Sequence, residues 1–374
     1  MKTKNIAGCV LAFAAAVLAV GCGRENTAAA GIVPFPSLAV RPLAAWPDEN
    51  IARRTFIPLD ASDPQYFFNR ADNIKVRDGK IYLLFWNRYN DTRLLVFDMQ
   101  GKGVLALDRR GEGPEEYAQI SAFDVDRRGN IHIVDGNRDQ LLVYGPHGDF
   151  IRRQDLPYEA DDIRCLPTGD YLLALCNWNR KQAAGRKVVL AAPDLSVKKA
   201  YFRYADDLDA NFILDSNGFT DCGDGMTAYN ESMNGHIYLF GRQGELADSL
   251  YVDFGSRTIP EKEKSDIEKN IWKNSSYLCL SGCNAVLDGS VAGNMYSRRK
   301  FAYVIDRSGG IVYSDFGEKY SDALSIIVGV TDDGSIVSCI RPEMLQMGET
   351  SHIPDSVKEF VGDENFALCI TKLK

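Results

Sequence analysis

The stretch DRRGEGPEEY, Asp108 to Tyr117, combines two glycines at G-x-G spacing with a proline, two arginines and three glutamates. A glycine-rich loop binds phosphate where it joins a strand to a helix, because the N-terminus of the helix then faces the anion. Here the flanking runs GVLALD and ISAFDVD both resemble strands. We therefore interpret the stretch as a crossing between two sheets, clamped by its charged side chains. Direct ligand contact by Arg109 and Arg110 is the alternative.

Metal chemistry finds little support in the sequence. Four histidines are scattered along the chain, at His132, His147, His236 and His352. They fall on different predicted strands and turns, so they cannot form a His₃ zinc site. Asp124, Asp135 and Asp215 are candidate carboxylates for a calcium-dependent hydrolase or lactonase site in a central channel. No spacing selects them, so the sequence predicts no cofactor and no catalytic residue, with a Ca²⁺ site as the alternative.

Seven cysteines follow Cys22, an odd number, so at least one is unpaired in a monomer. The CLSGC motif holds Cys279 and Cys283 without the second pair that a zinc site requires. Cys339 and Cys369 lie on neighbouring predicted strands and are the best candidates for a disulfide. Most of the other cysteines are expected to pack as small apolar side chains in the core.

The N-terminus has the features of an export signal. Two lysines precede an apolar run that ends in LAVGC, and this run is too short to span a bilayer comfortably. The cysteine after Ala-Val-Gly resembles a bacterial lipobox, which makes Cys22 the predicted site of lipidation, and cleavage near Ala28 to Ala30 is the alternative. Residues 1–21 are then the signal peptide and residues 22–50 a tether. The acyl chains would hold the protein in a membrane of the cell envelope, on its periplasmic or its outer surface.

The charge of the chain excludes one class of partner. The 374 residues carry a formal charge of −8, which becomes −10 when the two lysines of the leader are removed. Nucleic-acid binding depends on phosphate neutralisation by Lys and Arg, so an acidic, exported chain predicts no nucleic-acid partner. The sequence gives no indication of the oligomeric state.

Turn signals recur along the chain in two series. The first comprises turns around Gly79, Gly129, Gly169, Gly225, Gly289 and Gly334, each followed by an alternating apolar run. The second lies about twenty residues later, around Gly101, Gly148, Asp194, Gly244 and Gly309. Two hairpins per unit make a four-stranded antiparallel sheet, because Asp-Gly between apolar runs is a strong hairpin signal. Six units predict an all-β fold, a six-bladed β-propeller, with a sandwich as the weaker alternative.

The ends of the chain complete each other in this scheme. The sixth unit stops after the strand FALCITKL, Phe366 to Leu373, and lacks one strand. The upstream run RRTFIPLD, Arg53 to Asp60, supplies it and removes the exposed sheet edge. The predicted propeller therefore spans residues 51–374.

Three segments resemble a known family. RRGEGPEEY, FDVDRRGNIHIVD and the terminal DENFALCITKLK are similar to six-bladed β-propeller lipoproteins of Gram-negative bacteria, which are related to the NHL-repeat propellers. The resemblance covers nearly all of the mature chain, and Arg109 to Tyr117 is its most specific part. It implies the propeller fold and a location outside the cytoplasm. It implies no activity, because members of that family have no agreed one.

The strand order sorts the connections onto two faces. Both turn series fall on one face, here called the short-turn face. The longer connections and the crossings between blades fall on the other, the loop-rich face. Two inserts there, residues 256–274 and 341–365, contain Pro260 and Pro354 ahead of helix-forming residues, and each predicts a short helix over that face.

The loop-rich face also collects Asn, Arg and Trp side chains. We predict that it binds a ligand through Asn87, Arg88, Arg109, Arg110, Asn137, Arg138, Trp178, Asn179, Arg180, Asn230, Arg298 and Arg341. Function commonly resides where a rigid scaffold carries elaborate loops. The expected function is non-catalytic recognition of a glycan, a peptide or a protein partner by a membrane-tethered propeller. The metal-dependent propeller hydrolase is the alternative, and a structural subunit of an envelope complex is a third hypothesis.

Overall fold

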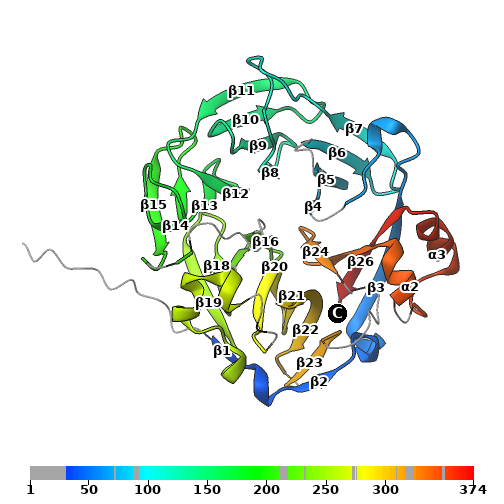
Figure 1. Cartoon of the computed structure of the whole chain (residues 1–374). Helices are drawn as coiled ribbons and strands as arrows, with labels where there is room; N and C mark the ends of the chain where they lie inside the picture. Colours follow the sequence, from blue (N-terminus) through cyan, green and yellow to red (C-terminus); the bar gives the residue numbers. More distant parts are fainter. Residues whose placement is uncertain are drawn as a thin grey trace, which may run out of the picture.

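The computed structural model describes residues 31–70, 73–86, 92–206, 208–209, 218–230, 233–271, 274, 276–308, 310–316, 324, 326–347 and 350–374. Its strands form six sheets arranged as blades around a central channel, which confirms the six-bladed β-propeller (Figure 1). Each blade is a four-stranded antiparallel meander whose first strand lines the channel.

The first three blades follow one another without inserts. Blade 1 comprises β4 (Asn73–Arg77), β5 (Lys80–Trp86), β6 (Thr92–Asp98) and β7 (Gly103–Leu107). Blade 2 comprises β8 (Ala122–Val125), β9 (Ile131–Asp135), β10 (Gln140–Tyr144) and β11 (Phe150–Asp155). Blade 3 comprises β12 (Ala160–Cys165), β13 (Tyr171–Leu175), β14 (Arg186–Ala191) and β15 (Val197–Arg203).

The other three blades complete the ring. Blade 4 comprises β16 (Phe219–Asp221), β17 (Thr227–Asn230), β18 (His236–Phe240) and β19 (Leu246–Asp253). Blade 5 comprises β20 (Cys279–Leu287), β21 (Ser290–Ser297), β22 (Arg299–Asp306) and β23 (Ile311–Ser314). Blade 6 comprises β24 (Ile327–Val330), β25 (Ile336–Ile340), β26 (Phe366–Leu373) and β3 (Ile51–Leu59). Strand β3 pairs antiparallel with β26, so the predicted closure by the N-terminal strand is confirmed.

The core lies between the blades. Buried apolar side chains form a cluster at each seam between neighbouring blades, such as Phe68, Phe97 and Phe366 between blades 6 and 1. Inner and middle strands therefore bury both of their faces, which explains continuous apolar runs such as LLVF in β6. Burying one such side chain stabilises the fold by about 1.5–3 kcal/mol.

The short turns follow the sequence prediction closely. All six glycines of the first turn series adopt positive φ, which other residues adopt only at a cost. The helices are short and lie mostly in the two inserts: η6 (Glu261–Ser265), α1 (Ile267–Asn270), α2 (Pro342–Met347) and α3 (Asp355–Gly362). Helix α3 packs Val357 and Val361 on blade 6, beside β26 and β3. Among the described residues, no helix has the length and hydrophobicity to cross a bilayer.

Two details of the sequence interpretation were wrong. Cys339 faces Leu368, and Cys369 faces Ser338, so the two cysteine side chains point to opposite sides of blade 6 and are not placed for the predicted disulfide. Residues 31–50, predicted as part of a free tether, instead lie along the outer edge of the propeller. Strand β1 (Gly31–Pro34) pairs parallel with β19, and β2 (Ala39–Arg41) pairs parallel with β23. The 3₁₀ turns η1 (Phe35–Ser37), η2 (Leu43–Ala45) and η3 (Asp48–Asn50) connect them to β3, and η4 (Pro64–Tyr66) and η5 (Gly255–Arg257) lie elsewhere.

Candidate functional site

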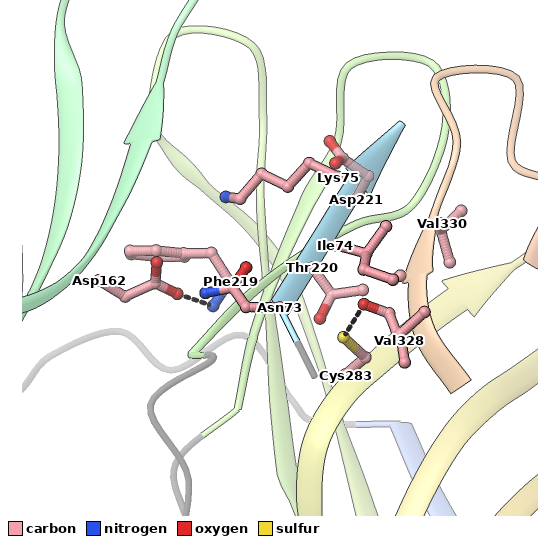
Figure 2. A pocket seen from close by; sticks show the side chains of 11 residues that line it. Asn73, Ile74, Lys75, Asp162, Phe219, Thr220, Asp221, Cys283, Val328 and Val330 are labelled. Carbon is pink, nitrogen blue, oxygen red and sulfur yellow. Dashed lines mark hydrogen bonds between the residues drawn. The ribbon is translucent and has the colours of Figure 1, made fainter. Parts of the chain in front are cut away.

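A small pocket occupies the middle of the channel, between the first strands of the blades (Figure 2). Lys75, Asp162 and Thr220 form its polar side, and Cys283 and Val328 belong to its apolar side. The volume of the pocket that is available to water is about 20 Å³. A cavity of that size holds roughly one water. The pocket can therefore accept a water or the end of one ligand group, and it cannot enclose a substrate.

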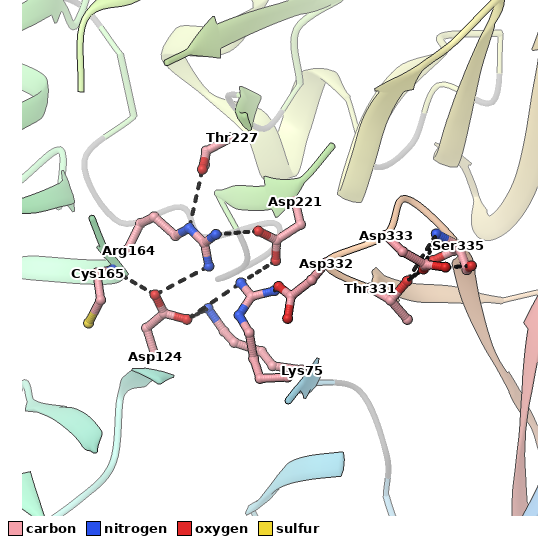
Figure 3. A network of polar contacts seen from close by, with 11 residues as sticks. Lys75, Asp124, Arg164, Cys165, Asp221, Thr227, Thr331, Asp332, Asp333 and Ser335 are labelled. Atoms are coloured by element: carbon pink, nitrogen blue, oxygen red, sulfur yellow. Dashed lines mark hydrogen bonds and ion pairs between the residues drawn. The ribbon is translucent and has the colours of Figure 1, made fainter. Parts of the chain in front are cut away.

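A network of charged side chains crosses the channel on the side of the short turns (Figure 3). Arg77, the last residue of β4, donates to Asp221 at the end of β16 and, at 2.7 Å, to Asp332 in the turn after β24. Blades 1 and 4 lie on opposite sides of a six-bladed ring, so the contact between Arg77 and Asp221 spans the channel. Arg164 on β12 pairs with the same Asp221 and lies 3.4 Å from Asp124.

Asp124 anchors this network from blade 2. Its side chain is fully buried, and its Oδ2 accepts a hydrogen bond of 2.6 Å from the amide of Cys165. Its Oδ1 lies 3.3 Å from the ammonium of Lys75. Burial disfavours that ammonium, but Asp124, Asp162 and Asp221 outweigh the effect and raise the pKa of Lys75. Three basic side chains thus lie between the carboxylates and bridge the channel near its short-turn end.

Polar side chains on the first and second strands also connect neighbouring blades. Asp162 Oδ2 accepts from the amide of Phe219, at 2.8 Å, and so joins blade 3 to blade 4. Asn294 joins blade 5 to blade 6, because its amide group donates to the carbonyl of Ile327 at 2.6 Å and accepts from the amide of Ile327 at 3.1 Å. These bonds satisfy backbone groups that would otherwise be unpaired where inner strands meet. Much of the polar chemistry in the channel is therefore structural.

Two adjacent carboxyl groups on β12 make the stability of the fold depend on pH. A β-bulge in β12 lies between Ala160 and Asp162 and contains Asp161. Burial raises the pKa of Asp161 to about 7, and the neighbouring Asp162 adds to the effect. Burial also raises the pKa of Asp162 to about 6, although Lys75 opposes it. Both carboxyl groups therefore bind protons more tightly in the folded chain than in the unfolded chain, where an Asp has a pKa near 3.9.

The free energy of unfolding should fall as the pH rises from about 4 to about 7, between the unfolded and folded pKa values of the two groups. Between the unfolded and folded pKa values the native state holds more protons, so each of the two groups destabilises the fold by up to about 1.4 kcal/mol per pH unit. The variant Asp161→Asn removes one of them and should gain stability relative to the parent chain over that pH range. Urea unfolding of both chains at four pH values measures this difference. Parallel pH profiles would contradict the assignment.

The opening stretch of the sequence forms a clamp between blades 1 and 2. Tyr117 is fully buried, and its hydroxyl group bonds the carbonyls of Thr92 and Leu107, each at 3.1 Å, on blade 1. Arg138 on blade 2 donates to the carbonyls of Gly111 and Glu116, at 2.7 and 3.1 Å. The glycine-containing crossing has strands on both sides and no helix, so its geometry is that of a clamp.

The predicted ligand-binding residues fall into three groups. Asn179 and Asn230 are buried, and Asn179 accepts from the amides of Glu159 and Lys181, while Arg138 is partly exposed and bound to the clamp. Seven others are exposed or partly exposed: Arg109, Arg110, Asn137, Trp178, Arg180, Arg298 and Arg341. Cys22, Asn87, Arg88 and Asp215 lie outside the described residues.

Sequence reasoning found one member of the channel network and missed the rest. Asp124 was a candidate carboxylate and does lie in the channel, whereas Asp135 accepts from the amide of Ala118 beside the clamp. Lys75, Arg77 and Arg164 were not predicted. For Lys75 and Arg77 the available signal was their spacing. The two charged residues lie two positions apart, directly before a turn, so their side chains point to the same side of an inner strand.

One protein family matches most of the chain. The model of a family described as "Domain of unknown function (DUF4934)" matches residues 51–365. The chain belongs to the DUF4934 family. No curated protein matches this DUF4934 chain.

Several solved structures are similar to the DUF4934 chain, and one of them has a TM-score above 0.5. A protein from Bacteroides fragilis NCTC 9343, assigned as exported, is 15% identical with a TM-score of 0.71, over 92% of this chain and 99% of its own. A DUF4221 member from Bacteroides vulgatus ATCC 8482 is 11% identical with a TM-score of 0.44, over 87% and 99%. The calcium-binding protein regucalcin from Agrobacterium tumefaciens C58 is 11% identical with a TM-score of 0.44, over 90% and 96%. At this level of identity the B. fragilis likeness shows the fold alone.

Proposed function

We propose that this protein is a recognition propeller, tethered to a membrane of the cell envelope through Cys22, that binds a glycan or peptide on its loop-rich face without transforming it. One observation carries the proposal. The ion pairs of Arg77 and Arg164 with Asp221 bridge the channel near its short-turn end, which favours the approach of a ligand from the loop-rich face. The rigid, closed ring then serves as a platform for the loops of that face.

The side chains exposed toward that face suit a ligand with flat and polar parts. Trp86, at the end of β5, is 44% exposed, and Trp178 is partly exposed on the connection after β13. Arg180 and Arg298 are exposed on the same face. An aromatic ring offers apolar area with little loss of side-chain entropy, and Arg binds carboxylate groups in a bidentate manner. A sugar or peptide that carries carboxylates fits this combination.

The charge pattern weighs against the metal-dependent hydrolase. Asp124, Asp221 and Asp332 do converge on the channel, as a calcium site would require. However, Arg77 lies among all three of them and supplies the positive charge that a metal ion would bring. Within the described residues, no three His, Cys, Asp or Glu side chains are grouped to hold a metal ion.

A thermal-shift screen of residues 23–374, which contain every described strand, tests the proposal. The screen uses divalent ions with a chelator, then glycans, then peptides. A ligand present at a hundred times its dissociation constant adds about 2.7 kcal/mol to the unfolding free energy, which is readily detected. We expect one glycan or peptide class to stabilise the chain. Stabilisation by Ca²⁺ that a chelator reverses would instead support the hydrolase.

Two substitutions then locate the site. Trp178→Ala and Arg180→Ala should each weaken binding of that ligand about tenfold or more, as interface anchors do. Arg128→Ala is the matched control, because Arg128 is exposed on a turn of the opposite face. If Arg128→Ala weakens binding as much as Arg180→Ala does, the ligand does not occupy the loop-rich face.

A further inference from the structure

Residues 31–50 form a strap along the outer edges of blades 4 and 5. Two short parallel ladders hold it, Gly31 to Pro34 against β19 and Ala39 to Arg41 against β23. The strap buries four of its own side chains against the blades: Val33, Phe35, Leu43 and Trp46. The ring of Phe35 lies 5.4 Å from that of Phe254. The strap is thus a fixed part of the propeller surface, and it precedes the start of the DUF4934 match at residue 51.

The outer side of the strap is apolar. Ile32 is 67% exposed and Val40 is 54% exposed, although both are large hydrophobic side chains. From residue 31 to residue 45 the other exposed residues are Gly, Ala, Pro and Ser, and Arg41 is the one charged residue in that range. The whole chain, by contrast, carries 51 acidic and 43 basic residues. Asp48 and Glu49 are exposed at the end of the strap, so the part without a carboxylate is residues 31–45.

The outer strands of blades 2 and 3 also expose one apolar residue each, beside charged residues, whereas Val104 is 48% exposed on the uncharged strand β7 of blade 1. Ile151 on β11 is followed by Arg152 and Arg153, and Val197 on β15 is followed by Lys198 and Lys199. These charged neighbours make the rims of blades 2 and 3 hydrophilic. Residues 31–45 therefore differ in chemistry from the rims of blades 2 and 3, although Asp248 is exposed on the neighbouring strand β19.

The strap also begins close to the predicted anchor. Eight residues separate Cys22 from Gly31. An extended chain covers at most about 3.3–3.6 Å per residue, so the start of β1 lies within about 30 Å of the lipidated cysteine. A protein held so close to a bilayer presents some part of its surface to the lipid, and the connection favours the edge that carries β1.

We propose that the strap rests on the lipid bilayer, with Ile32 and Val40 at the boundary between headgroups and acyl chains. This inference depends on the membrane anchoring in the proposed function. Apolar side chains without carboxylates suit that boundary, and Arg41 suits anionic headgroups. The propeller then stands on its rim with its axis parallel to the membrane, and the loop-rich face opens sideways to partners.

Depth-dependent fluorescence quenching tests this orientation. The lipidated chain is purified with one cysteine introduced at a rim position, Ile32→Cys or Val40→Cys, and labelled with an environment-sensitive dye. It is bound to vesicles of phosphatidylethanolamine and phosphatidylglycerol that contain doxyl-labelled lipid. Ile151→Cys, on the exposed part of β11, is the matched control. We expect the labels at 32 and 40 to lose most of their emission and the label at 151 to keep it.

Flotation of each labelled protein with the vesicles separates two kinds of failure. If the chain does not float, or if Cys22→Ser floats equally well, the lipid anchor of the proposed function is wrong and this inference falls with it. If the chain floats through Cys22 but the three labels are quenched alike, the anchor stands and the strap does not face the membrane. A label at Arg298→Cys that is quenched most would place the loop-rich face on the lipid and also overturn the inference.

Discussion

Replacing Arg77 with methionine is expected to lower the free energy of unfolding by about 3–5 kcal/mol, the range for removing one partner of a buried ion pair. Arg77 is 6% exposed and contacts Asp124, Asp221 and Asp332 from three other blades. Without it these carboxylates face one another in the channel with less compensation. Urea unfolding followed by circular dichroism measures the loss.

Arg128→Met provides the comparison for Arg77→Met. Arg128 is exposed on the turn between β8 and β9, where its backbone amide bonds Asp126 and its side chain is not buried. Substitutions at such surface positions change stability by no more than about 0.5 kcal/mol. Equal effects of the two substitutions would show that the charge network does not hold the blades together.

The second large effect is expected for Tyr117→Ala, with a loss of about 3–5 kcal/mol, as for other large buried rings. Tyr117 is fully buried in the core between blades 1 and 2, together with Phe123 and Tyr144. Removing its ring leaves a cavity in that seam. Because the clamp is structural, we expect the affinity for a ligand of the loop-rich face to remain unchanged while stability falls.

Tyr117→Phe separates the ring from its hydroxyl group. The hydroxyl oxygen also accepts from the amide of Arg109, at 3.2 Å, and its loss leaves buried carbonyl groups without this partner. Such a loss costs about 1–3 kcal/mol, so the phenylalanine variant should be intermediate in urea unfolding. A ligand affinity that falls together with stability in both variants would support the alternative in which this stretch contacts the ligand.

The blades could be predicted from the sequence because a hairpin is a local structure. A turn such as Asp78-Gly79 and the alternating runs beside it specify two neighbouring strands within some fifteen residues. Strand β3 was also predictable, although its partner is distant, because the last blade lacked one strand. In both cases a hydrophobic pattern and a count of strands were sufficient.

The channel could not be predicted in the same way, because it depends on register. Asp162 is buried and the adjacent Asp161 is partly buried because a bulge interrupts β12 between Ala160 and Asp162. The register also excludes the predicted disulfide, because an offset of one residue places the side chains of Cys339 and Cys369 on opposite sides of the sheet. The sequence gives the strands but not these single-residue offsets between them.

The strap was missed for a different reason. Its composition, rich in Ala and Pro, is that of a linker, and β1 and β2 comprise only four and three residues. Each pairs with a strand more than 200 residues away, so no local pattern announces the pairing. The buried Phe35 and Trp46 are the signal that was available, because a free tether has no use for large aromatic residues.

The pairing of β3 with β26 also determines when the fold can be completed during synthesis. Leu59 lies opposite Phe366, so about 300 residues must be synthesised before the first strand of the propeller finds its partner. The intervening blades are built from neighbouring hairpins and can form in the order in which they emerge. Until the C-terminus arrives, β3 offers an unpaired edge, and such edges invite wrong partners. The ring therefore closes only after β26 has been synthesised, and a chain truncated before β26 cannot close it.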